Sequence, residues 1–177
     1  MDNQTKQWFV MRDLTRPNAK RPAYLMLREK GIRYFTPMIW KIQVCKGKRQ
    51  RREVPYMQDL LFVYDTRSVI DPLVEEVPTF QYRFLRHTYR VPMTVREKDM
   101  EQFIRAVELS ASPQYYLPEE VTPDMRNRKI RMIGGQLDGY EGSLITVRGS
   151  KVKRLLVELP SLLAATVEVE PEFIQLL

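Results

Sequence analysis

The side chains that could act in covalent or acid–base chemistry are few in this 177-residue sequence, and they form no set. A single histidine, His87, and a single cysteine, Cys45, exclude an internal disulfide and a cysteine-based zinc site. The neighbouring carboxylates Glu119 and Glu120 could suggest acid–base work, but no second group accompanies them. We therefore expect a protein that is not an enzyme and that carries no cofactor and no metal.

Basic side chains are a more informative feature of the sequence. The formal net charge is +7, which favours contact with polyanions or with acidic protein surfaces. A solvated basic surface is the plain alternative. Two groups of basic residues stand out: Arg12, Arg16, Lys20 and Arg21 near the start, and Lys46, Lys48, Arg49, Arg51 and Arg52 in the block 46–52.

The elements that would position these residues differ between the two halves of the chain. Residues 1–110 combine short apolar runs with segments of helical spacing, which predicts an α/β sandwich domain. Thr94 and Glu97 have the spacing of a capping box before the last helix. The expected strands lie at 8–11, 32–44 (interrupted by Pro37), 60–64 and 80–85, the helices at 19–30, 69–76 and from about 96, and a hairpin tip at 46–52.

The second half contains only short strand-like segments. Residues 111–124 contain three prolines and show no periodicity, so we interpret them as a linker. Residues 125–177 show glycine-rich turns at intervals of about ten residues, which predicts a small β-barrel. The fold class expected for the whole chain is therefore α+β. The barrel strands should lie at 129–133, 143–147, 154–159 and 165–169.

No apolar stretch approaches the roughly 20 residues that a membrane span needs. The first residues also lack the apolar core of a signal peptide. We expect a cytoplasmic protein with no membrane partner, and we expect a monomer.

A glycine-containing motif in the second half resembles the KOW motif. Residues 129–142 run from an apolar strand through a glycine turn and the tip residue Leu137 to a Gly-x-x-Gly sequence. We expect Gly139 and Gly142 to allow a positive φ at a tight corner. Leu137 and Tyr140 would then be held at the tip of a loop between two strands.

The first half contains an ordered set of short segments: Trp8-Phe9-Val10, a helix, Thr36-Pro37-Met38, the basic hairpin 46–52, and Leu60 to Val63. In this order the first half is similar to the N-terminal domain of the NusG family of transcription factors. The stretch Tyr56 to Leu60 lacks the aromatic-proline turn that this family usually shows. Its absence favours a specialised paralogue similar to RfaH and the UpxY antiterminators.

The resemblance implies a function on transcribing RNA polymerase. An apolar patch would dock on the clamp helices of the polymerase largest subunit, and a basic face would contact the non-template DNA strand. The loop tips of the barrel would hold a small-subunit ribosomal protein or the Rho termination factor. The implied residues are Trp8, Phe9, Tyr56, Met57 and Leu60 for docking, Arg12, Arg16, Lys20 and Arg21 for DNA, and Leu137, Tyr140, Leu162 and Leu163 for the barrel partner.

The activity that this resemblance implies is operon-specific transcription elongation and antitermination. KOW barrels also occur in ribosomal proteins that bind RNA. The alternative is therefore a general nucleic-acid-binding or ribosome-associated KOW module. The N-terminal domain discriminates between the two, because ribosomal KOW proteins lack it.

Overall fold

The computed structural model describes residues 4–16, 21–147 and 149–177. The chain divides into two compact units, Met1–Glu97 and Lys98–Leu177. The first unit mixes helices with a sheet and the second is dominated by strands, which confirms the expected α+β class. Within the described ranges, no helix is long and apolar enough to cross a membrane.

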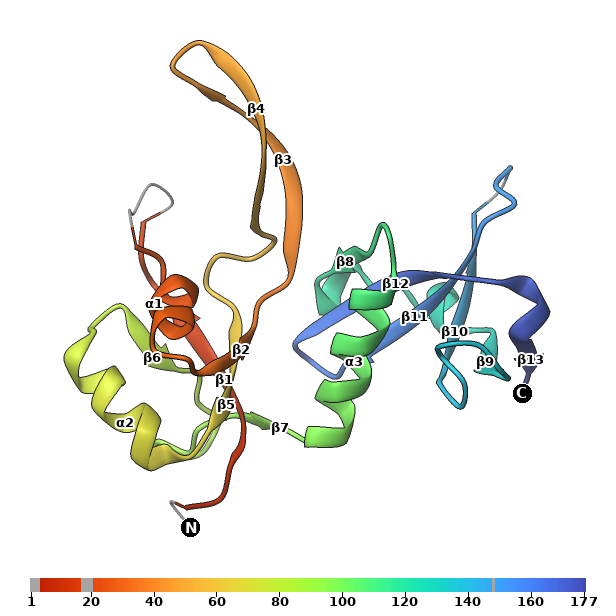
Figure 1. Cartoon of the computed structure of the whole chain (residues 1–177). Coiled ribbons are helices and arrows are strands. Elements are labelled where there is room, and N and C mark those ends of the chain that lie inside the picture. The colour runs from red at the N-terminus through yellow and green to blue at the C-terminus, as the bar shows by residue number, and fades with distance from the viewer. Residues whose placement is uncertain (1–3, 17–20, 148) are drawn as a thin grey trace. The chain divides into compact units, whose positions relative to one another are not determined.

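A five-stranded antiparallel sheet forms the centre of the first unit (Figure 1). Its central strand β1 pairs with β5 on one side and with β6 and β7 on the other, so the backbone of β1 is hydrogen-bonded along both edges. The strands are β1 (Gln7–Asp13), β2 (Arg33–Phe35), β5 (Leu61–Asp65), β6 (Phe80–Tyr82) and β7 (Thr94–Val95).

Two helices, α1 (Ala23–Glu29) and α2 (Arg67–Glu76), pack on one face of this sheet. Strand alternation sends Phe9 and Met11 to that face, where they join Leu27 and Ile70 in the core. The Tyr82 hydroxyl also donates a hydrogen bond of 2.7 Å to the carboxylate of Asp71 in α2. Burial and this hydrogen bond raise the pKa of Tyr82.

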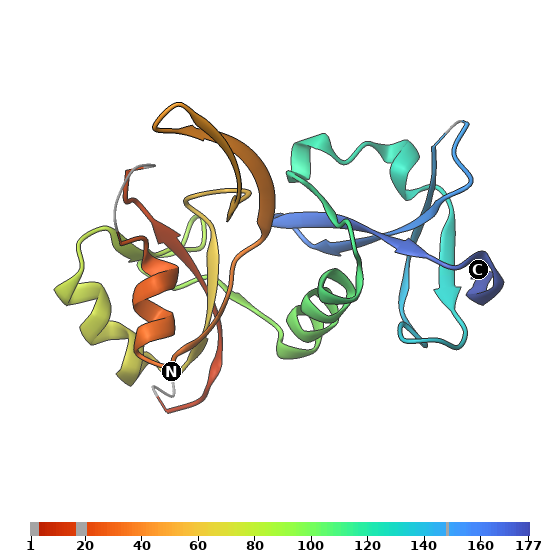
Figure 2. The same ribbon diagram turned by 45° about the horizontal axis from the view of Figure 1, so that its top comes forward.

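The strands β3 (Met38–Cys45) and β4 (Lys48–Pro55) form a separate two-stranded sheet that extends away from the five-stranded sheet in both views (Figures 1 and 2). Only Lys46 and Gly47 separate the two strands, and both adopt a positive φ, at 49° and 75°, as a two-residue hairpin turn requires. Most of the block 46–52, expected as a hairpin tip, therefore lies in β4. The break expected at Pro37 is found between β2 and β3.

A buried carboxylate joins the end of β1 to the start of α1. Asp13 accepts backbone N–H bonds from Thr15 at 3.0 Å and from Ala23 at 2.7 Å. Ala23 is the first residue of α1, and the preceding Pro22 makes no side-chain capping bond. Asp13 therefore supplies, from a neighbouring strand, the acceptor that a helix start usually takes from its N-cap residue.

The second unit is built on a six-stranded antiparallel sheet. Its hydrogen-bonded order is β13-β9-β10-β11-β12-β8, so the four sequence-predicted strands are confirmed as the four central ones. The helix α3 (Glu97–Leu109) precedes it, and short 3-10 turns lie at Pro118–Glu120, Pro123–Arg126 and Pro171–Phe173. The strands are β8 (Gln114–Tyr116), β9 (Lys129–Met132), β10 (Glu141–Thr146), β11 (Lys153–Leu159), β12 (Leu163–Val169) and β13 (Ile174–Leu176).

The segment 111–124, expected as a linker, contains β8 and is attached to the sheet. Tyr115 pairs with Ala165 of β12. The buried Arg154 donates to the Ser112 carbonyl and, at 3.0 Å, to the Thr166 hydroxyl. A three-residue strand is too short to produce a periodic pattern, which explains why the prolines dominated the sequence signal. The helix α3, expected in a first domain ending at 110, groups with the second unit, and the expected boundaries stay predictions.

Two local expectations differ from the structure. Thr94 lies in β7 opposite Phe9, so it does not cap α3, which begins at Glu97. Gly139 adopts the expected positive φ of 79°, but Gly142 does not. Gly142 is required for another reason, because a Cβ there would overlap the Leu156 carbonyl and lie 2.7 Å from Leu155 Cδ1.

Replacing Asp13 should destabilise the first unit. Asp13→Ala leaves two backbone N–H groups without their acceptor, at an expected cost of about 2–4 kcal/mol in the free energy of unfolding. Asp13→Asn keeps one acceptor oxygen and should cost less. Urea unfolding followed by circular dichroism measures both, with the exposed Glu75→Ala of α2 as control. An Asp13→Ala loss no larger than that of the control would contradict the capping role.

Replacing Gly142 should destabilise the second unit by overpacking. Gly142→Ala should cost about 1–3 kcal/mol, because backbone and core atoms must move to admit the methyl group. Gly139→Asn is the matched control, since its Cβ would meet open space and Asn tolerates positive φ. The same urea titration compares them, and equal losses for the two variants would rule out the steric explanation.

Candidate functional site

The turn between β4 and β5, residues 56–60, carries two of the expected docking residues. The Tyr56 N–H donates to the Pro37 carbonyl at 2.8 Å, and the Thr36 hydroxyl donates to the Leu60 carbonyl at 3.2 Å. These bonds hold both ends of the turn against the start of β3. Tyr56 and Met57 are half-buried, so each presents part of its side chain at the surface.

The same turn is tied to the loop that follows β1. The Gln58 amide donates to the Thr15 carbonyl at 2.6 Å. The Asp59 carboxylate lies 3.7 Å from the guanidinium groups of both Arg12 and Arg83. The candidate docking turn and the start of the candidate DNA-contacting segment therefore form one connected surface. Sequence reasoning missed Gln58 and Asp59, which had no signal beyond their polarity.

A groove of about 420 Å³ lies between the loop after β1, the start of α1 and the base of the β3–β4 hairpin. Arg16, Lys41 and Arg52 contribute positive charge to it, and Asp13 and Glu53 contribute negative charge. Lys41 and Arg52 are paired in register across the hairpin. The groove can bind an anionic group through charge and hydrogen bonds. The alternation of side chains along β3 and β4, together with the hairpin turn between them, was the sequence signal that could have placed Lys41 beside Arg52.

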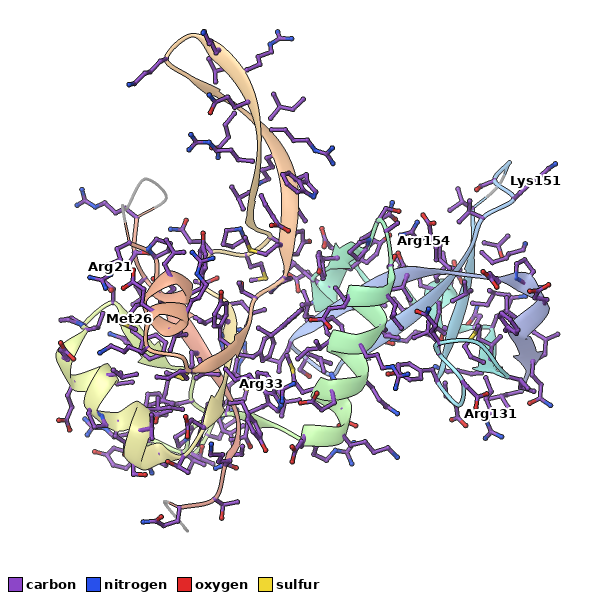
Figure 3. The ribbon with its side chains drawn as sticks, viewed as in Figure 1. Arg21, Met26, Arg33, Arg131, Lys151 and Arg154 are labelled. Atoms are coloured by element: carbon purple, nitrogen blue, oxygen red, sulfur yellow. The ribbon has the colours of Figure 1, made fainter. Side chains whose placement is uncertain are left out.

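The four expected DNA-contacting residues do not have equivalent surroundings. Arg16 is exposed and lines the groove. Arg12 lies next to Asp59, and Arg21 makes an ion pair with Glu29 at the end of α1. Figure 3 shows Arg21 beside this helix. Lys20 lies outside the described residues.

Three of the expected docking residues are buried. Phe9 is a core residue beneath α1 and α2, so its expected place in an exposed patch is corrected. Trp8 points to the opposite face, where its ring lies 5.2 Å from that of Tyr64 and 5.1 Å from the guanidinium carbon of Arg33. Leu60 is also fully buried. Adjacent strand residues point to opposite faces, so Trp8 and Phe9 cannot share one patch.

The four residues expected at exposed barrel tips are also buried. Leu163 pairs with Leu159 across the β11–β12 hairpin. Burial raises the pKa of Tyr140. A small sheet has few positions with which to close its core, and Leu137, Tyr140, Leu162 and Leu163 fill that role.

The site has features of a binding surface. Asp59 forms ion pairs with Arg12 and Arg83, and the turn is held by hydrogen bonds to the backbone. Within the described residues, no group of three or more His, Cys, Asp or Glu side chains could hold a metal ion. His87 lies in an exposed loop with a positive φ of 63°, away from the groove lining.

Comparisons with known proteins assign the chain to a family. A family profile described as "Transcription termination factor nusG" matches residues 6–104 and so covers the turn at residues 56–60 and the groove beside it. A solved structure described as "Domain interaction in Thermotoga maritima NusG" is similar, with a TM-score of 0.46 and 12% identity over 98% of each chain. A search of curated proteins found no match. Because the profile spans more than half of its residues, the chain belongs to the NusG family.

Proposed function

We propose that this chain is an operon-specific antitermination factor that docks on RNA polymerase and suppresses pausing or termination. As a member of the NusG family, it is a transcription elongation or termination factor that binds RNA polymerase, and such factors are not enzymes. The family profile across residues 6–104 is the observation that carries the proposal. Such a factor works where the polymerase works, in the cytoplasm.

The docking surface in this proposal is the turn at residues 56–60. Tyr56 and Met57 present partly exposed aromatic and thioether groups on a backbone fixed at both ends. A fixed turn loses little conformational entropy when a partner covers it. We propose that this pair packs on the clamp helices of the polymerase largest subunit. The buried Trp8 and Leu60 would support the sheet behind this surface.

The groove beside the turn is the proposed contact with the non-template DNA strand. Arg16 is exposed at its edge, and Lys41 and Arg52 add charge from the hairpin. Arg12 and Arg21 would reach phosphates after exchanging their present carboxylate partners. A domain that is docked on the polymerase and also holds the DNA strand would keep the clamp closed mechanically. It would make or break no covalent bond.

The barrel partner in this proposal is a small-subunit ribosomal protein or Rho. The turns that contain Leu137 and Leu162 form the ends of the β9–β10 and β11–β12 hairpins. Their backbones are the natural contact points, because the side chains themselves close the core.

Co-purification tests the proposal as a whole. The tagged full-length chain should retain RNA polymerase from its own host, and transcript mapping in a deletion strain should show early termination in a small set of operons. Retention of ribosomal RNA without polymerase would support the ribosome-associated alternative. Early termination across most transcripts would instead indicate a general factor.

The docking surface makes a first prediction. Tyr56→Ala combined with Met57→Ala should lower the affinity for a clamp-helix fragment of the polymerase by roughly tenfold or more, because two central apolar side chains are removed. The unfolding midpoint should change little, since both side chains are partly exposed. The matched control is Thr88→Ala with Tyr89→Ala, which removes an aromatic group from an exposed loop. Equal affinities for the docking and control variants would reject this surface.

The basic segment makes a second prediction. Changing Arg12, Arg16, Lys20 and Arg21 to Gln should reduce the salt dependence of binding to a polymerase elongation complex. The slope of log affinity against log salt should fall by about 0.7 for each phosphate that the variant no longer neutralises. A control of equal charge changes Arg126, Arg128, Arg131 and Lys151 of the second unit to Gln. If both variants lower the slope equally, the effect is one of net charge and not of this segment.

A further inference from the structure

The β3–β4 hairpin presents two chemically different faces. Residues that lie opposite each other across the hairpin share a face, and the register pairs Ile42 with Arg51 and Val44 with Arg49. One face, which we call the stacking face, therefore carries Trp40, Ile42, Val44, Arg49 and Arg51. Glu53, opposite Trp40 at the base of the hairpin, also borders the groove. The other, the polar face, carries Lys41, Gln43, Lys48, Gln50 and Arg52, with Ile39 opposite Val54 at its base.

The polar face is turned toward α1, because Lys41, Gln43 and Arg52 line the groove next to that helix. The stacking face consequently points away from the core of the first unit. Its apolar side chains are exposed: Trp40 by 58%, Ile42 by 72% and Val44 by 68%. These side chains add nothing to the core of the first unit, so their exposed pattern favours a binding partner.

An arginine is already stacked on the exposed tryptophan. The guanidinium carbon of Arg51 lies 4.7 Å from the centre of the Trp40 ring. Such a pair offers a broad planar surface with positive charge at its edge. The hairpin as a whole, residues 38–55, contains six basic residues and one acidic residue. A planar, positively charged surface beside aliphatic side chains suits unpaired nucleobases that are joined by phosphates.

We propose that the stacking face binds single-stranded DNA, with one base on the Trp40–Arg51 pair and the next against Ile42 and Val44. A duplex is a poorer fit, since its bases are stacked inside and its phosphates would meet the aliphatic side chains. RNA is a poorer fit because this face has no hydroxyl or amide side chain that could hydrogen-bond to a ribose 2′-hydroxyl. A second copy of the chain would bring two strongly basic hairpins together.

Strand binding at this face does not depend on polymerase docking, and its test uses the full-length protein alone. A fluorescent oligothymidylate of about 15 nucleotides, comparable to one small-domain site, is titrated at low salt. Binding should raise its anisotropy and quench tryptophan fluorescence. Trp8 is fully buried and Trp40 is exposed, so the quenched signal comes from Trp40. Failure here would leave the proposed antitermination function untouched.

Variants separate stacking from charge. Trp40→Ala should weaken binding by roughly tenfold, and Trp40→Phe should retain most of the affinity. Gln50→Ala on the polar face is the matched control and should bind as the parent protein does. Arg51→Lys keeps the charge but loses the planar group, so it should weaken binding less than Trp40→Ala does. Ile42→Ser serves as a second stacking variant if Trp40→Ala fails to fold by circular dichroism.

Several outcomes would overturn the proposal. Unchanged affinity for both Trp40→Ala and Ile42→Ser would show that charge alone holds the strand. Equal or tighter binding of an oligouridylate RNA would assign the face to RNA, and equal or tighter binding of a duplex of the same length would assign it to double-stranded DNA. Absence of any binding at low salt would point to a protein partner for this face.

Discussion

The carboxylate of Asp13 is the contact on which the functional surface depends. It is buried at the end of the central strand and accepts backbone N–H bonds from both the loop after β1 and the first residue of α1. A helix of seven residues that begins after Pro22 has no side-chain cap of its own. One side chain therefore fixes where the strand ends, where the helix begins and from which point the intervening basic loop emerges.

Hydrogen bonds from the neighbouring turn complete this frame. Gln58 reaches the Thr15 carbonyl, and Asp59 lies between Arg12 and Arg83. The turn that presents Tyr56 and Met57 is consequently tied to the same loop that presents Arg16. Binding surfaces gain affinity when their groups are held in place before the partner arrives. The polar contacts beneath this surface hold its side chains in place in this way, although none of these contacts was visible as a sequence motif.

The sequence predicted the elements that contain a repeating apolar pattern. It did not predict features that depend on a single tertiary contact. The segments around Trp8 and Leu61 and the four central strands of the second unit were predicted because each contains a run of apolar or alternating residues. The strand β8 has three residues, and its place depends on pairing with β12. Gly142 was expected to adopt a positive φ. Glycine is instead required there because the Leu156 backbone approaches too closely for a Cβ, which only the packed sheet reveals. Exposure was similarly hard to predict, because Leu162 and Leu163 look like turn residues in sequence and are core residues in space.

The hairpin is the part of the first unit whose sequence is least explained by folding. Two-stranded sheets are marginal alone, and this one is stabilised at its base by the Tyr56–Pro37 bond and along its length by cross-strand pairs. Polar side chains at positions 40, 42 and 44 would leave the core of the first unit unchanged, because all three positions are exposed. Apolar side chains there leave an exposed patch that favours aggregation, and the surrounding basic residues oppose it by charge repulsion. The same combination of planar, aliphatic and cationic groups suits a strand of unpaired nucleotides, so the basic residues would serve both solubility and the binding that we propose.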